Sequence, residues 1–140
     1  RAFGAGWEPK RTSGGAQLAS KPMKITHVYH GSDDQTHFEE IDWIETPAQD
    51  AFYTRTEMRN AGITMFAIQP AGYFADWHPA PGRRLVTMIS GSAEVGVSDG
   101  EKRTIGPGDV ILFADQTGPG HTMRVLGSEP RVALHVSLAD

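Results

Sequence analysis

Two histidines lie at the expected boundaries of strands, His78 at the end of one and His121 at the start of another, and each has ionisable neighbours. His78 lies in "YFADWHPA" (residues 73–80), and His121 follows the turn residues "DQTGPG" (residues 115–120). Imidazole titrates near neutral pH, so two such rings in one pocket would be suited to moving protons to and from a bound molecule. Asp76 or Asp115 could orient one of the rings through a hydrogen bond to a ring nitrogen.

Arg84 adds a permanent positive charge close to His78. A guanidinium facing inward grips a carboxylate or phosphate with two parallel hydrogen bonds, most strongly where water is excluded. Because Arg83 is adjacent, only one of the two arginines is expected to face inward. The alternative role of Arg84 is a structural salt bridge to Asp76 or Glu94. Four aromatic residues could wall an apolar pocket or belong to a plain core: Phe66, Tyr73, Trp77 and Phe113.

Short strands must position these side chains. Runs rich in Val, Ile, Leu, Phe and Thr are separated by Gly, Pro, Asp and Asn, which supply turn geometry. This pattern predicts strands over 23–30, 62–70, 84–90, 92–100, 109–114, 121–126 and 131–139, with tight reversals at 98–100 and 106–109. Residues 34–45 fit a helical turn or an edge strand equally well. Many short strands at such spacing are typical of an all-β sandwich or barrel.

Strand alternation predicts which side chains share a face. If residues 73–80 are extended, then 74, 76, 78 and 80 lie on one side, which places Asp76 beside His78 and Trp77 opposite. Pro79 and Pro81 require the strand to end or to lie at a sheet edge. The other histidines are expected to be structural. His27, His30 and His37 are expected at the surface or a sheet edge, and His135 is expected to pack with Ala133 and Ser137.

The amino-acid composition excludes several classes of function. The chain has 140 residues and no cysteine, which excludes disulfides, thiolate catalysis and cysteine-ligated zinc. The formal charge of -4 argues against a nucleic-acid partner, and no apolar run approaches the roughly 20 residues of a membrane span. We expect a cytoplasmic protein without a membrane partner. Residues 1–22 have the composition of a disordered or vector-derived tail, and residues 23–140 are expected to form one domain.

Two segments resemble the two halves of the cupin signature. They are "GYFADWHPAPGRRLVTMISG" (residues 72–91) and "GPGDVILFADQTGPGHTMRV" (residues 106–125). The matching residues are Gly72, His78, Gly91, Pro107, Gly108, Asp109, Gly118 and His121. Three positions depart from the pattern, because Ala80 replaces the second histidine, Arg84 replaces the glutamate and Val125 replaces the asparagine.

The chain from Met23 onward is most similar to a subgroup of small single-domain bacterial cupins that read "DWHPAP", "GPGD" and "GH" in the same order. This resemblance implies a double-stranded β-helix, or jelly-roll barrel, that is often a homodimer. It implies much less about the substrate, since this subgroup largely lacks an assigned activity.

The departures from the signature weaken a metal site. Tight divalent sites usually take three or four protein ligands, whereas the motif positions here supply only His78 and His121. The guanidinium of Arg84 cannot ligate a metal, and at about 4 Å it would repel a cation by about 4 kcal/mol per unit charge. We therefore expect no tightly bound cofactor. A divalent Fe, Zn, Mn or Ni ion on His78 and His121 would need Asp76 or Asp115 as a further ligand.

Three functions remain open from the sequence. The first is a non-redox isomerase, cyclase or lyase that binds an anionic organic substrate in the barrel. In that enzyme His78, His121 and Asp76 are catalytic, and the substrate contacts are Arg84, Trp77, Tyr73, Phe113 and Asp115. The second is a metal-dependent, dioxygenase-type cupin. The third is a non-catalytic ligand-binding or sensory module.

Overall fold

Strands account for all the regular secondary structure in the computed structural model, which describes residues 23–43, 45–47, 54–56 and 58–139. They are β1 (Met23–His30), β2 (Thr36–Trp43), β3 (Glu45–Pro47), β4 (Thr54–Thr56), β5 (Ala61–Gln69), β6 (Phe74–His78), β7 (Arg84–Ser90), β8 (Ser92–Val97), β9 (Lys102–Ile105), β10 (Val110–Phe113), β11 (His121–Leu126) and β12 (Arg131–Leu138). No helix long and apolar enough to span a bilayer occurs in these ranges.

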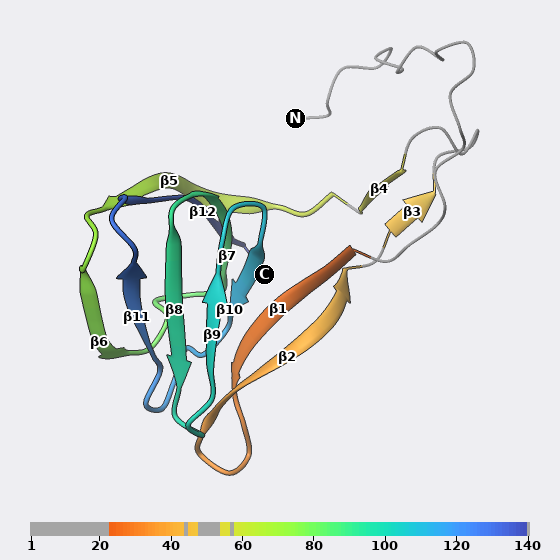
Figure 1. The fold of residues 1–140 in the computed structure, drawn as a ribbon. Helices are drawn as coiled ribbons and strands as arrows, with labels where there is room; N and C mark the ends of the chain where they lie inside the picture. The colour runs from red at the N-terminus through yellow and green to blue at the C-terminus, as the bar shows by residue number, and fades with distance from the viewer. Residues whose placement is uncertain (1–22, 44, 48–53, 57, 140) are drawn as a thin grey trace. The chain divides into compact units, whose positions relative to one another are not determined.

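Ten of the strands form two sheets (Figure 1). The larger sheet has the order β2-β1-β10-β7-β12-β5, and the smaller has the order β6-β11-β8-β9. Apart from the parallel pair β1 and β10, the pairings with a defined register are antiparallel. Non-consecutive neighbours in both sheets are the mark of a jelly roll, so the predicted all-β double-stranded β-helix is confirmed.

The sequence pattern placed these strands well. Every run predicted as a strand contains one, and the edge strand β2 (36–43) lies within the ambiguous residues 34–45. The strand β9 (102–105) was not predicted. The predicted reversals hold as well, since Gly100 and Gly108 both have positive φ, at 98° and 87°. Glycine is the residue that adopts this conformation without steric cost, which explains its place in "SDG" and "GPGD".

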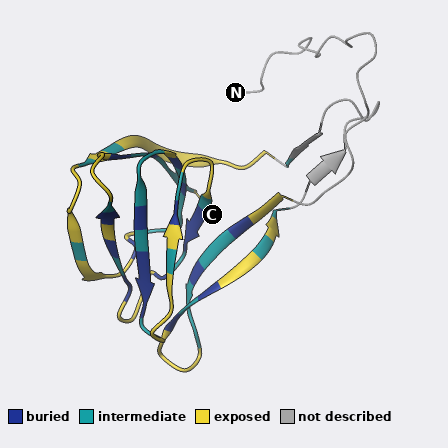
Figure 2. Cartoon of the chain, viewed as in Figure 1, coloured by how far each residue is buried: buried dark blue, intermediate teal, exposed yellow. Residues whose placement is uncertain are grey.

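The core lies between the two sheets. Alternate residues of β8 turn inward, so Ala93, Val95 and Val97 are buried while Glu94 remains half-buried and meets Lys102 at 3.7 Å. Buried positions appear as dark bands on β8, β10 and β11 in Figure 2. Residues such as Val86, Met88, Ile111 and Ala133 face them from the larger sheet.

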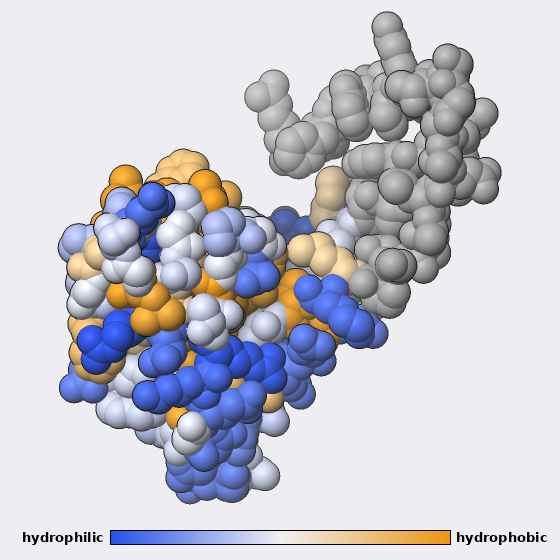
Figure 3. Space-filling view, in the orientation of Figure 1, coloured by the Kyte–Doolittle hydropathy of each residue, from blue (hydrophilic) through white to orange (hydrophobic). Residues whose placement is uncertain are grey.

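The edge strand β5 differs from the other strands of its sheet. It pairs only with β12, and it exposes 70% of Ile63, 65% of Phe66 and 70% of Ile68. Figure 3 shows hydrophobic surface in orange at the top left of the view, where β5 runs in Figure 1. An exposed apolar edge strand offers unpaired backbone groups to another chain.

The chain divides into two units. Residues 24–41 and 59–139 carry both large sheets, whereas the short hairpin of β3 and β4 belongs to the second unit with residues 42–58. The candidate site described next lies within the first of these units. The tail predicted for residues 1–22 lies outside the described residues.

Candidate functional site

A cavity of about 220 Å³ opens between the sheets. Its walls come from β5, β6, β7, β10, β11 and β12 and from the segment that joins β6 to β7. Its nitrogen-bearing side chains are Gln69, His78, Arg84, His121, Arg131 and His135, and Tyr73 and Phe113 add aromatic surface. None of its described lining residues is an aspartate or glutamate, although the chain has 17 of them. The acidic protein therefore encloses a cavity with positive side chains.

His121 is held from behind by a buried carboxylate. Its Nδ1 lies 2.7 Å from Oδ2 of Asp115, which is 0% exposed, while His121 itself is 6% exposed. An ionised carboxylate only accepts hydrogen bonds, so Nδ1–H donates and Nε2 keeps its lone pair in the neutral ring. Phe113 stacks on the ring at a centroid distance of 4.3 Å. Asp115 thus orients His121, as predicted for one of the two candidate aspartates, but it does not line the cavity.

His78 lies at the exposed mouth of the same cavity. In the sheet register it is directly opposite His121, and the two ring centroids are 4.5 Å apart. Its Nδ1 donates to the backbone carbonyl of Asp76 at 2.7 Å. Because a carbonyl can only accept, Nε2 of the neutral His78 ring also carries a lone pair. The structure therefore brings together two imidazoles that both present an acceptor nitrogen.

A close approach of two chain segments makes this pairing of histidines feasible. Gly120 has φ of +76°, and a Cβ at that position would collide with the carbonyl group of His78. Thr36, which is fully buried, donates to the Gly120 carbonyl at 2.6 Å and fixes the turn. Glycine is needed here both for its conformation and for the lack of a side chain.

The prediction that Asp76 shares a face with His78 is wrong, because β6 contains a bulge. His78 is opposite His121 and Ala75 is opposite Met123, so three steps on β6 match two on β11. Such an extra residue interrupts strict alternation. Ala75 and His78 both line the cavity, whereas Asp76 and Trp77 do not.

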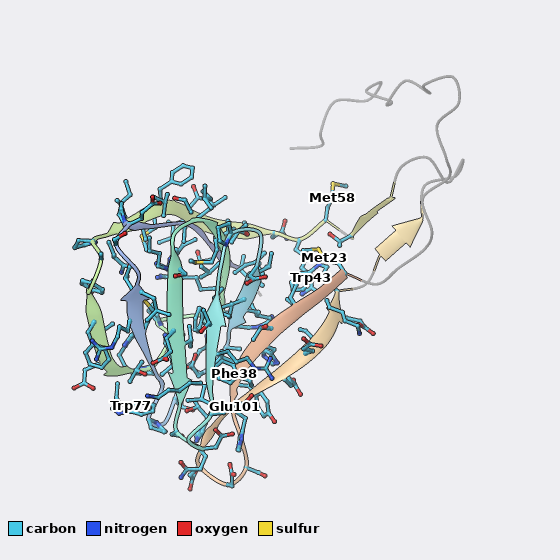
Figure 4. All side chains as sticks on the ribbon, in the orientation of Figure 1. Met23, Phe38, Trp43, Met58, Trp77 and Glu101 are labelled. Carbon is cyan, nitrogen blue, oxygen red and sulfur yellow. The ribbon has the colours of Figure 1, made fainter. Side chains whose placement is uncertain are left out.

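Asp76 instead accepts a hydrogen bond from the backbone N–H of Trp77 at 2.9 Å. Trp77 is 49% exposed at the end of β6, where Figure 4 labels it. The predicted substrate contact through Trp77 is therefore not supported, and neither is a catalytic place for Asp76. Phe66, the fourth aromatic candidate, is exposed on β5 and does not line the cavity.

Arg84 faces the cavity, as predicted, and Arg83 does not line it. Among the described residues Arg84 forms no ion pair. The predicted alternative partners are engaged elsewhere, since Glu94 meets Lys102 and Asp76 accepts a hydrogen bond from the backbone N–H of Trp77. Arg84 is half-buried and lies opposite Phe113 in the sheet register. Its charge is available to a bound anion.

The sequence pattern did not point to Arg131, at the start of β12. This side chain lines the cavity and is only 4% exposed. Its Nη1 donates to Oε1 of Gln69 at 2.7 Å, and its Nε has no hydrogen-bond partner in the described structure. Burial lowers the pKa of Arg131, because low polarity disfavours the charged form. Alternation along β12 from His135 through Ala133 to Arg131 was the signal that could have found it.

His135 also lines the cavity, where packing alone had been expected. Both of its ring nitrogens are buried without a described partner. Burial first, and then the charges of Arg131 and Arg84, lower the pKa of His135 from 6.5 to about 4. The ring is therefore neutral at physiological pH.

The remaining histidines lie outside the cavity, on the edge strand β2 and on its neighbour β1. His30 and His27 are half-buried on β1. His37 on β2 lies between Asp33 and Asp99, with its ring nitrogens 2.8 Å from a carboxylate oxygen of each. Hydrogen bonds to Asp33 and then Asp99 raise the pKa of His37. This contact joins the turn after β1 to the turn after β8.

The donors in the cavity do not fit a tight metal site. No group of three or more His, Asp or Glu side chains in the described ranges converges in a way that could hold a metal ion. His78 and His121 supply two nitrogens, Asp115 is turned toward Nδ1 of His121, and Ala80, which also lines the cavity, has no donor atom in its side chain. We therefore derive no chemical step through a metal.

Comparison with known proteins gave matches only among solved structures. No protein-family model and no curated protein matches the chain. A conserved protein of unknown function from Streptococcus pyogenes is 24% identical over 61% of this chain and 69% of its own, with a TM-score of 0.46. A cupin-like protein from Thermotoga maritima is 19% identical over 54% of this chain and 55% of its own, with a TM-score of 0.47.

A DMSP lyase from Ruegeria pomeroyi DSS-3 is 26% identical over 55% of this chain and 38% of its own, with a TM-score of 0.47. The matched region thus spans less than two thirds of the last two proteins. Since these TM-scores are low, the jelly-roll assignment rests on the strand topology described above.

Proposed function

We propose that this chain is a cupin-type protein that binds an anionic organic molecule in its barrel and moves protons on it without redox chemistry. The reaction class would be that of an isomerase, a cyclase or a lyase. One observation carries the proposal: Arg84, His78 and His121 line the same cavity, and neither ring uses its Nε2 in a described hydrogen bond.

The roles follow from burial and hydrogen bonding. Arg84 binds the carboxylate of the ligand through its two parallel N–H groups. His121, with Asp115 behind it, accepts a proton at Nε2 from the carbon next to that carboxylate, and Asp115 stabilises the resulting imidazolium. The C–H electron pair moves toward the carboxylate, where the charge of Arg84 stabilises it.

Two outcomes of this step account for both the proton and the electron pair. In an isomerase the proton returns from His121 to another atom of the same ligand. In a lyase the electron pair instead expels a leaving group from the neighbouring carbon, and the proton goes to that group or to water. His78, at the exposed mouth, is placed to exchange protons with solvent.

Hydrogen–deuterium exchange tests the proposal directly. A panel of small carboxylates is incubated with the protein in D₂O, and loss of the C–H signals is followed by NMR. We expect exchange in at least one carboxylate, and His121→Gln should slow it by about 100-fold or more. His27→Gln is the matched control, since His27 bonds Glu39 outside the cavity.

Exchange that is unchanged in His121→Gln would contradict the assignment of the base. Binding of carboxylates with no exchange at all would leave the non-catalytic binding module as the better description.

A metal-dependent enzyme is the second candidate, favoured by one observation. Both histidines bond through Nδ1 and present Nε2, which is also the arrangement of a metal-ligating imidazole with an outer partner. Elemental analysis of protein purified without added metal separates the two. Near-stoichiometric Fe, Zn, Mn or Ni would reject the metal-free proposal.

The homodimer stays a prediction. The exposed residues Ile63, Phe66 and Ile68 on β5 support it, because an edge strand can pair with its own copy around a twofold axis. Light scattering of the wild type and of Phe66→Asp tests it, with a dimer expected only for the wild type.

A further inference from the structure

We infer that the molecule bound in this barrel carries two anionic groups, and that Arg131 binds the second of them. This inference rests on the proposed function and makes it more specific, since it names short organic dianions, such as dicarboxylates, as the ligand class. Arg131 lies outside the two cupin-like segments, and its burial and hydrogen bonding point to this role.

Arg131 has no counter-charge among the described residues. It is 4% exposed, its one described hydrogen bond goes to the neutral Gln69, and its buried Nε has no described partner. Taking a charged group out of water is costly unless an opposite charge and hydrogen bonds compensate. A structural arginine in such a place is normally paired with a carboxylate. The missing partner of Arg131 is best supplied by a ligand.

Arg84 and Arg131 reach the cavity near opposite ends of β12. Arg131 begins this strand, and Arg84 on the neighbouring β7 lies beside its other end. Arg84 is in register with Ser137, and Arg131 is in register with Gln69. Residues 131 and 137 are about 20 Å apart along a strand that rises about 3.4 Å per residue. Both long side chains reach inward from these ends. A single carboxylate fills one guanidinium fork, so two forks approaching from opposite ends call for two anionic groups.

His135 lies between these two arginines. It is two residues from the Ser137 end of β12 and four residues from the Arg131 end, and its two ring nitrogens have no described partner. Arg131 and Arg84 both lower its pKa, so both guanidinium groups act on the middle of the cavity. A neutral imidazole there can hydrogen-bond the uncharged centre of a ligand, such as a hydroxyl or keto group.

The volume of the cavity favours a short ligand. About 220 Å³ corresponds to about seven water molecules at about 30 Å³ each. This is below the range of drug-sized ligand pockets, about 300–1,000 Å³. A short dicarboxylate suits a space of this size.

Calorimetry with charge-matched pairs of ligands tests the inference. The probes are dicarboxylates from oxalate to adipate, each compared with its monoamide, which has the same shape and one charge less. Succinate and succinamate are the central pair. We expect at least one dicarboxylate to bind about 10- to 100-fold more tightly than its monoamide, as for a hydrogen bond to a charged group.

Three variants locate the second charge. Arg131→Met should reduce the preference for the dicarboxylate to about onefold, and Arg131→Lys should keep part of it, because the charge remains but the fork is lost. Arg124→Met is the matched control. Arg124 carries the same charge but lies over the Phe74 ring at 4.4 Å, outside the cavity lining.

The melting temperature gives a readout of folding. Arg131→Met should melt at the same temperature as the wild type or higher, because it removes an uncompensated buried charge. A structural role would instead lower it.

The possible results separate the inference from the proposed function. Monoamides that bind as tightly as their dicarboxylates, or a preference that persists in Arg131→Met, would overturn the second anionic group while the anion-binding function survives. If neither monoanions nor dianions bind, the proposed function and the inference both fail.

Discussion

His135 should make the protein less stable in mild acid. Its pKa in the folded protein is about 4, against an ordinary value of 6.5, and the causes are burial and the charges of Arg131 and Arg84. Between these two values the unfolded chain binds more protons than the folded one. The free energy of unfolding must therefore fall as the pH drops from about 6.5 toward about 4, and it should be independent of this residue above about pH 7.

The size of this effect can be bounded. The difference between 6.5 and about 4 corresponds to at most about 3 kcal/mol, at about 1.36 kcal/mol per pKa unit. His135 is only partly buried, and solvent screening reduces the expected loss to about 1–2 kcal/mol. That is a large fraction of the stability of a small domain.

Urea denaturation of the wild type and of His135→Leu measures the effect. The comparison uses the change in unfolding free energy from about pH 7 to about pH 4.5, so that any constant effect of the substitution cancels. The wild type should lose about 1–2 kcal/mol more than the variant over this range. An equal loss in the two proteins would refute the reasoning.

Other titrating groups act in different pH windows. The pKa of His37 is raised by its hydrogen bonds to Asp33 and Asp99. Its contribution is fully present below pH 6.5 and is lost as the pH rises through the folded pKa, which is the opposite trend. The pKa of Asp33 is lowered below 3.8, mainly by its hydrogen bond with His37, so its contribution disappears only in stronger acid. The window assigned to His135 lies between these two.

Three further predictions follow from the cavity and the turn beside it. Arg84→Met should weaken binding of carboxylates by about 10- to 100-fold in calorimetry. It should leave the melting temperature almost unchanged, because no described carboxylate pairs with Arg84. A lower melting temperature with unchanged binding would contradict the role of Arg84 in binding the anion. Asp115→Asn should slow deuterium exchange by about 100-fold or more, since the orientation and charge support of His121 are lost, and an unchanged rate would remove Asp115 from the mechanism. Gly120→Ala should lower the free energy of unfolding by more than about 2 kcal/mol in urea titration, whereas Gly100→Ala, with positive φ but open space around it, should cost less; equal costs would contradict the close approach.

The sequence predicted most of the strands and five of the cavity side chains because these depend on local rules. Turn residues bound each strand, and the motif spacing placed His78, His121 and Arg84 at strand ends that meet in a jelly roll. Tyr73 and Phe113 also line the cavity, as predicted.

The sequence misplaced Asp76 because a bulge depends on the pairing of β6 with β11, which no single strand reveals. It missed Arg131 for a different reason. An arginine that begins a strand resembles one of many surface charges, and only the packing of β5 against β12 shows that its sole described partner is Gln69.

The bulge in β6 makes the length of this strand as important as its composition. A bulge shifts the phase of the side chains by one residue, so His78 faces inward only because one extra residue precedes it. Deleting either Asp76 or Trp77 would keep every cavity residue in the sequence and yet rotate His78 out of the barrel. Engineered libraries or loop grafts in this region should therefore vary residue identity and keep the residue count between Ala75 and His78 constant.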